Sequence, residues 1–168
     1  MAETLIEHPN REKAESKATK AIIALLLIVS AVLIAVVTIG GWAELQGAQI
    51  VAIAYALLYL LLAFYVFRWN RGVLPVAAAA ATLFAVMAAV AAPAWFDRDK
   101  VGFAEPALEP SILGLLTVII VPVQVLLLAF AMRGFAQKWN VEVEKRGDDD
   151  SYDDGYDDGY DRTQPAGA

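Results

Sequence analysis

Four long apolar stretches, separated by short polar segments, make up half of the chain. None of the four contains an Asp, Glu, Lys, Arg or His. Each is close to the ~20 residues that an α-helix needs to cross a ~30 Å hydrocarbon core. Only a helix satisfies the backbone hydrogen bonds of such a segment in lipid. The pattern therefore predicts an all-α, polytopic membrane protein, a four-transmembrane-helix bundle over residues 21–132 with spans at 21–39, 48–67, 73–95 and 111–132. The very short turn at residues 70–72 is expected to hold the second and third spans antiparallel and adjacent.

Polar segments flank the bundle on both sides. Residues 1–20 form an N-terminal segment, in which we expect a short helix that is capped by Asn10 and continues into the first span. Residues 133–146 form a basic juxtamembrane segment. Phe135 and Trp139 lie four residues apart, so on a continued helix they would share one face. That face is expected to anchor the chain at the lipid headgroups, or alternatively to dock a partner.

The C-terminal residues 147–168 carry eight Asp and one Arg, with two tandem Tyr-Asp-Asp-Gly units. Such a segment buries too little apolar surface to offset the entropy of ordering, which predicts a disordered acidic tail. A solvated tail and a segment that binds a basic partner are both compatible with this composition.

Lys and Arg are distributed unevenly between the two sides of the predicted membrane. Eleven lie in the N-terminal segment, the second turn and the C-terminal segment, against two in the longest loop. The positive-inside rule therefore predicts that both the N-terminus and the C-terminus are cytoplasmic. Residues 41–46 and 96–110 are then expected to face outward.

Missing residue types exclude several kinds of chemistry. The chain has no cysteine and one histidine, His8, which excludes disulfides, thiolate metal sites and bis-histidine haem. No ionisable group lies inside a span, although proton-coupled transporters normally need one. Small four-span multidrug exporters carry a carboxylate in the first span, which is absent here. We therefore expect no catalytic residue, no metal, no cofactor and no nucleic-acid partner.

Each span carries a polar residue near its middle. In one interpretation these residues form a small polar pocket that binds a ligand or passes a solute. In the other they form interhelical hydrogen bonds that hold the bundle together. The candidate residues of this mid-membrane layer are Ser30, Tyr55, Tyr59, Thr82 and Gln124.

Gln124 is the most constrained of these five residues. Its amide would be unsatisfied if it faced lipid, so we expect it to point into the bundle. Its predicted partner is Tyr59 or Tyr55 on the second span. The Val118 carbonyl is the alternative, because Pro122 has no N–H to donate to it.

Alanines recur every four residues along the third span. Small residues at this spacing let helix backbones approach closely. The stripe could pack within the chain, or it could support self-association or contact with another membrane protein; it consists of Ala77, Ala81, Ala85 and Ala89.

The segment at residues 133–142, Arg-Gly-Phe-Ala-Gln-Lys-Trp-Asn-Val-Glu, and the Ala-, Val- and Asp-rich composition give the chain a family likeness. Over residues 9–144 it resembles small four-span plasma-membrane proteins of high-GC Gram-positive bacteria, which have no assigned activity. The resemblance implies a location in a bacterial plasma (inner) membrane, and it supplies no site residues. We expect a non-enzymatic structural, accessory or assembly subunit, with a small-solute channel or ion-independent facilitator as the alternative.

Overall fold

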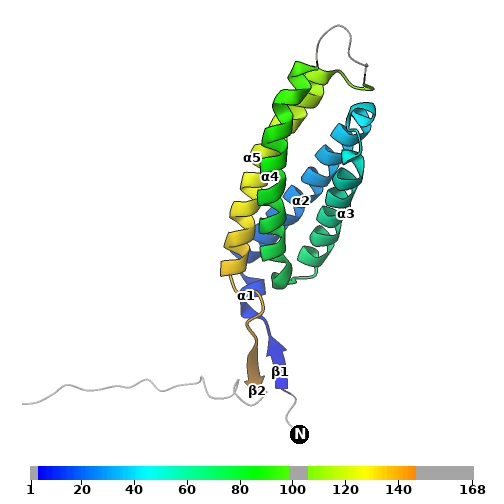
Figure 1. Cartoon of the computed structure of the whole chain (residues 1–168). Helices are drawn as coiled ribbons and strands as arrows, with labels where there is room; N and C mark the ends of the chain where they lie inside the picture. Colours follow the sequence, from blue (N-terminus) through cyan, green and yellow to red (C-terminus); the bar gives the residue numbers. More distant parts are fainter. Residues whose placement is uncertain (1–3, 99–105, 147–168) are drawn as a thin grey trace, which may run out of the picture. The chain divides into compact units, whose positions relative to one another are not determined.

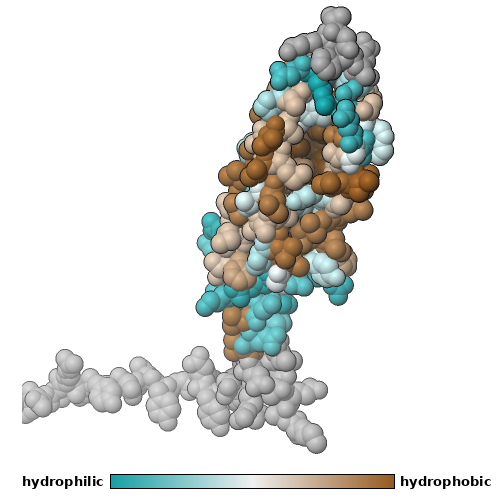
Figure 2. Space-filling view, viewed as in Figure 1, coloured by the Kyte–Doolittle hydropathy of each residue, from teal (hydrophilic) through white to brown (hydrophobic). Residues whose placement is uncertain are grey.

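The computed structural model describes residues 4–98 and 106–146, which form two units. The larger unit, residues 8–141, is a bundle of four long helices, each apolar and long enough to cross a membrane. Hydrophobic residues cover the bundle between hydrophilic patches at its two ends (Figure 2). The predicted four-helix membrane architecture is confirmed; the helices are α2 (Ala14–Gly40), α3 (Ala48–Phe67), α4 (Leu74–Asp97) and α5 (Pro110–Ala136).

Three short helical elements complete the bundle. The four-residue α1 (Pro9–Glu12) precedes α2, and two turns of 3-10 helix, η1 (Trp42–Glu44) and η2 (Arg71–Val73), follow α2 and α3. The end of the bundle that carries α1 and η2 is called the terminal end below. The end that carries η1 and the connection between α4 and α5 is called the loop end.

The predicted start of the first helix is wrong. Helix α1 begins at Pro9, so Asn10 lies inside it rather than at its cap. Lys13 has an extended backbone (ψ 133°) and separates α1 from α2. The Asn10 side chain instead donates from Nδ2 to the Lys138 carbonyl at 3.1 Å. It therefore ties the segment before the first span to the segment after the last one.

The long helices pack as two hairpins, α2 with α3 and α4 with α5 (Figure 1). Helix α2 also packs against α5, and this contact joins the two hairpins. In contrast, α3 and α4 touch little, although only a few residues connect them. The expectation that the second and third spans are adjacent is therefore wrong for most of their length, because α4 gains more contact from α5.

The alanine stripe of α4 lies mainly inside the chain. Ala77 and Ala81 are fully buried, Ala85 is half-buried and Ala89 is exposed. Small side chains let α4 approach α5 closely and gain dispersion contacts, which drive helix association in lipid. Packing within the chain therefore accounts for Ala77 and Ala81, and neither is accessible to another protein.

The smaller unit is a two-stranded antiparallel ribbon made from both ends of the chain. Strand β1 (Thr4–Glu7) pairs with β2 (Val143–Arg146), with Thr4 opposite Arg146 and Glu7 opposite Val143. The ribbon was not predicted, and it adds two short strands to a fold whose spans are all helical. The predicted disordered tail, residues 147–168, lies outside the described residues.

Candidate functional site: a hydrogen-bonded chain between three spans

Three of the five predicted mid-membrane residues meet in the centre of the bundle. The Tyr59 hydroxyl of α3 donates to Oε1 of Gln124 on α5 at 2.7 Å. Nε2 of Gln124 donates to Oγ of Ser30 on α2 at 2.9 Å, and Ser30 donates in turn to the Leu26 carbonyl at 2.7 Å. These bonds form a continuous chain, called the polar chain below, that links three spans.

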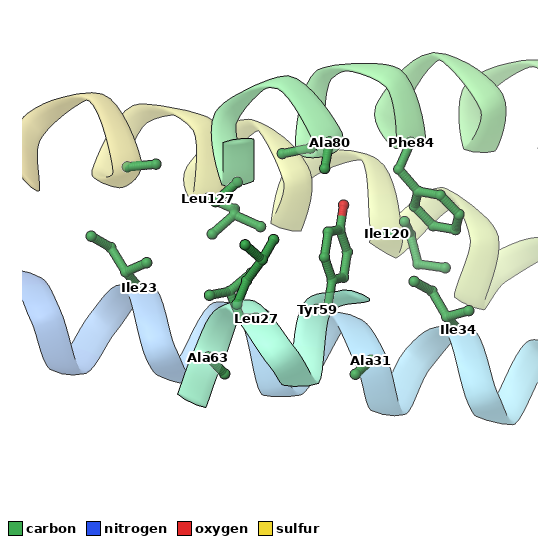
Figure 3. Close-up of a cluster of buried hydrophobic side chains, with 14 of the residues drawn as sticks. Ile23, Leu27, Ala31, Ile34, Tyr59, Ala63, Ala80, Phe84, Ile120 and Leu127 are labelled. Carbon is green, nitrogen blue, oxygen red and sulfur yellow. The ribbon is translucent and has the colours of Figure 1, made fainter. Parts of the chain in front are cut away.

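The polar chain is sealed from its surroundings. Tyr59, Gln124 and Ser30 all have 0% exposed surface. Around Tyr59 lie apolar side chains of α2 and α5, including Leu27 and Ile120 (Figure 3). A polar group without a partner in such surroundings would cost a few kcal/mol. The three side chains therefore satisfy one another where neither water nor lipid can.

The bond from Tyr59 to Gln124 is the one expected between the second and fourth spans. Both helices run from the loop end to the terminal end, so their midpoints lie at the same depth. The alternative, a bond from Gln124 to the Val118 carbonyl, is not formed; the amide bonds to Tyr59 and Ser30 instead. Ser30 serves as acceptor because its own proton is directed to its helix backbone.

Tyr55 and Phe84 surround the polar chain with aromatic rings. The ring centroids of Tyr55 and Tyr59 are 6.0 Å apart in an edge-to-face arrangement. Phe84 of α4 lies 4.8 Å from Tyr55 and 6.2 Å from Tyr59. The third span, α4, therefore contacts the site through an aromatic ring and not through a hydrogen bond. Sequence analysis missed Phe84, because nothing in its pattern separates it from other core residues.

Thr82 does not belong to the site. It is exposed on α4, and its hydroxyl donates to the Ala78 carbonyl of its own helix at 2.9 Å. Mid-span position gave the right depth, but one residue along a helix turns the side chain by about 100°. Because Ala81 is the buried neighbour, Thr82 faces away from the core. The prediction that it joins the polar layer is wrong.

A second cluster, at the terminal end, was also missed. Helix α5 ends at Ala136, and Lys138 adopts a left-handed backbone (φ 50°) that turns the chain. Trp139 is consequently 0% exposed, whereas Phe135 is 39% exposed. The prediction that Phe135 and Trp139 share one face of a continued helix at the lipid headgroups is wrong, because the helix ends between them.

Trp139 is held by contacts from several segments. Its Nε1 donates to Oε1 of Gln137 at 3.0 Å, and Nε2 of Gln137 donates to Oγ1 of Thr19 at 3.0 Å. The Trp69 ring meets Trp139 edge-to-face at 5.3 Å, and Nζ of Lys20 lies 4.1 Å above Trp69. This group, the Trp139 cluster, joins the start of α2 and the segment after α5 to the turn after α3.

The described spans contain no arrangement suited to metal or acid–base chemistry. Within residues 4–98 and 106–146, no group of three or more His, Cys, Asp or Glu side chains could hold a metal ion. The hydroxyl of Ser30 donates to a carbonyl and not to a base. The geometry can hold helices together, and it offers no activated nucleophile.

No protein-family model matches the chain, and neither the curated proteins nor the solved structures include one that is significantly similar to it. The site is therefore interpreted from its own geometry.

Proposed function

We propose that this protein is a non-enzymatic accessory or assembly subunit of a bacterial plasma membrane, with both termini in the cytoplasm. The observation that carries the proposal is a groove on the outside of the α4–α5 hairpin. Ala89, Pro93, Val118 and Pro122 all line it.

Each of the two prolines in this groove removes one helical hydrogen-bond donor. Proline has no N–H, so Pro93 cannot donate to the Ala89 carbonyl and Pro122 cannot donate to that of Val118. Ala89 is exposed and Val118 is 45% exposed, so both carbonyl-bearing residues reach the surface at membrane depth. A free carbonyl in lipid is costly. A transmembrane helix of another protein that carries Ser, Thr or Asn could donate to them while packing against the small Ala89 side chain.

The polar chain supports the same proposal and argues against a solute facilitator. A hydrated path needs polar groups that water can reach, whereas Tyr59, Gln124 and Ser30 are fully buried and bonded to one another. Hydrogen bonds of this kind hold a bundle in one arrangement. A fixed bundle presents a constant surface to a partner.

Co-purification from the native membrane tests the proposal. The full chain, isolated in mild detergent, is expected to carry one membrane protein in near-stoichiometric amount, measured by quantitative mass spectrometry. Ala89→Leu should fill the groove and remove that partner. Ala79→Leu is the matched control, because Ala79 is also exposed on α4 but lies outside the groove.

Two results would contradict the proposal. One is a chain without a stoichiometric partner, or with one that Ala89→Leu and Ala79→Leu affect equally. The other is permeability to glycerol or urea in vesicles that contain the protein, measured by light scattering. This permeability would have to be lost in Gln124→Leu. The second result would favour the facilitator.

A further inference from the structure

An apolar cavity of about 140 Å³ lies between the two hairpins, in the half of the bundle near the loop end. Its back wall consists of buried residues of α2 and α5, including Ile34 and Ile120. Its side walls come from α3 and α4, where Ala52 and Ala88 keep the space open. The cavity exists because α3 and α4 touch little over this part of their length.

The cavity has too few available polar groups to hold a water molecule. Its two polar lining residues, Thr38 and Thr117, donate their hydroxyl protons to their own helices, to Ile34 at 2.6 Å and Leu113 at 2.7 Å. A buried water needs two to four polar partners, and apolar cavities of about 150 Å³ in other proteins stay dry and bind small hydrocarbons. The occupant that fits this lining is therefore hydrocarbon.

The opening of the cavity faces sideways, between α3 and α4. Val51 on α3 and Met87 on α4 line the cavity and are each 44% exposed, whereas the lining residues of α2 and α5 are buried. At this depth the surrounding medium is the acyl region of the bilayer. Lipid chains thus have direct access to the space.

At the loop end and toward mid-membrane, the described residues close the cavity. Nη1 of Arg98 lies 3.7 Å from Oε2 of Glu44 and donates to the Glu44 carbonyl at 3.1 Å, which ties the end of α4 to η1. The guanidinium of Arg98 lies 5.5 Å from the ring of Trp95, which lines the cavity. Toward mid-membrane, the ring of Phe84 lines the cavity, and the Tyr55 ring packs against it with centroids 4.8 Å apart. An occupant therefore enters from the lipid side.

We propose that one acyl chain of a membrane phospholipid inserts between α3 and α4 and occupies this cavity as a specific ligand. The acyl chain fills the space where α3 and α4 lack direct contact, so it joins the two hairpins near the loop end. The polar chain performs the same task at mid-membrane. Side-chain size at Ala52 and Ala88 controls how much of the acyl chain fits.

Photo-crosslinking in vesicles tests this proposal. The full chain is reconstituted in phosphatidylglycerol and phosphatidylcholine with a trace of phospholipid that carries a diazirine in one acyl chain. After irradiation, crosslinked peptides are mapped by mass spectrometry. We expect severalfold more labelling at the cavity residues of α3 and α4 than at the exposed Leu57 and Leu83 of the same helices. Excess unlabelled lipid should saturate the cavity signal.

A matched pair of variants on α3 makes the result specific. Ala52→Leu should reduce cavity labelling severalfold, whereas Ala54→Leu, on the exposed side of the same helix, should leave it unchanged. Ala88→Leu repeats the test from α4 if Ala52→Leu fails to fold. Equal labelling of the cavity and the exposed faces, or equal labelling of the two α3 variants, would overturn the proposal. So would a cavity signal that hexane removes and that excess phospholipid does not, because the occupant would then be a small apolar solute.

Discussion

Replacing Gln124 by Leu tests the polar chain most directly. The substitution keeps a similar volume and removes the acceptor for Tyr59 and the donor to Ser30. Interhelical hydrogen bonds in membranes contribute about 0.6–2 kcal/mol each. Ser30 retains its bond to the Leu26 carbonyl, so the Tyr59 hydroxyl is the group left unpaired, at a cost of about 1–3 kcal/mol. Since Leu suits the apolar surroundings, we expect a net loss of about 2 kcal/mol in unfolding free energy.

The measurement is equilibrium unfolding in mixed micelles of dodecylmaltoside and SDS, followed by circular dichroism. Tyr59→Phe removes the donor hydroxyl alone and is expected to cost about 1 kcal/mol. In the double variant no hydroxyl is left unpaired. The combined loss should therefore fall short of the sum of the single losses by about 1 kcal/mol, the coupling expected for two residues in direct contact.

Thr82→Val is the control for loss of a hydroxyl in a span. Its bond stays within α4 and the residue is exposed, so the unfolding free energy should change by less than about 0.5 kcal/mol. The reasoning is refuted if Gln124→Leu is as stable as Thr82→Val, or if the Tyr59 and Gln124 substitutions are additive.

Three further predictions concern the ends of the bundle. Trp139→Ala should lower the unfolding free energy by about 3–5 kcal/mol because the ring is fully buried. Phe135→Ala, at an exposed position, is the control, and equal losses would contradict the stabilising role of the Trp139 cluster. In intact cells an impermeant maleimide should label Ala43→Cys and leave Lys13→Cys unlabelled; the reverse would overturn the proposed orientation, and the absence of native cysteine keeps the background low. Truncation after Arg146 should leave the melting temperature in detergent unchanged, and a clear decrease would show that the acidic tail stabilises the bundle.

Charge and length were sufficient to predict the four spans. A charge in hydrocarbon costs several kcal/mol, so uncharged stretches of about 20 residues leave few alternatives. The helix ends outside the apolar stretches were less accurate: the helix expected from Asn10 into the first span is interrupted at Lys13, and the helix expected to continue to Trp139 ends at Ala136. Helices extend past the membrane when polar residues are good helix formers, and composition sets no limit there. The β1–β2 ribbon depends on pairing between opposite ends of the chain, which local patterns do not encode.

The site residues were predicted correctly where only their depth in the membrane matters. They were predicted incorrectly where the face of the helix on which they lie matters. Gln124 and Tyr59 lie at the same depth on parallel helices, so their bond followed from topology. Thr82 has a suitable depth but the wrong face, and the face depends on α4 packing against α5 and away from α3. The burial of Trp139 depends on the left-handed backbone conformation of Lys138. This conformation is rare for a lysine, and no sequence pattern predicts it here.

The pairing of β1 with β2 can form only after all four spans have been synthesised. About 135 residues separate Glu7 from its partner Val143, and at 5–20 residues per second their synthesis takes on the order of ten seconds. All four spans are made during that interval while β1 waits with unpaired backbone groups. A chain that stops before Val143 can insert its helices and still lack a partner for β1. The ribbon is therefore the last of the described elements that synthesis allows to form.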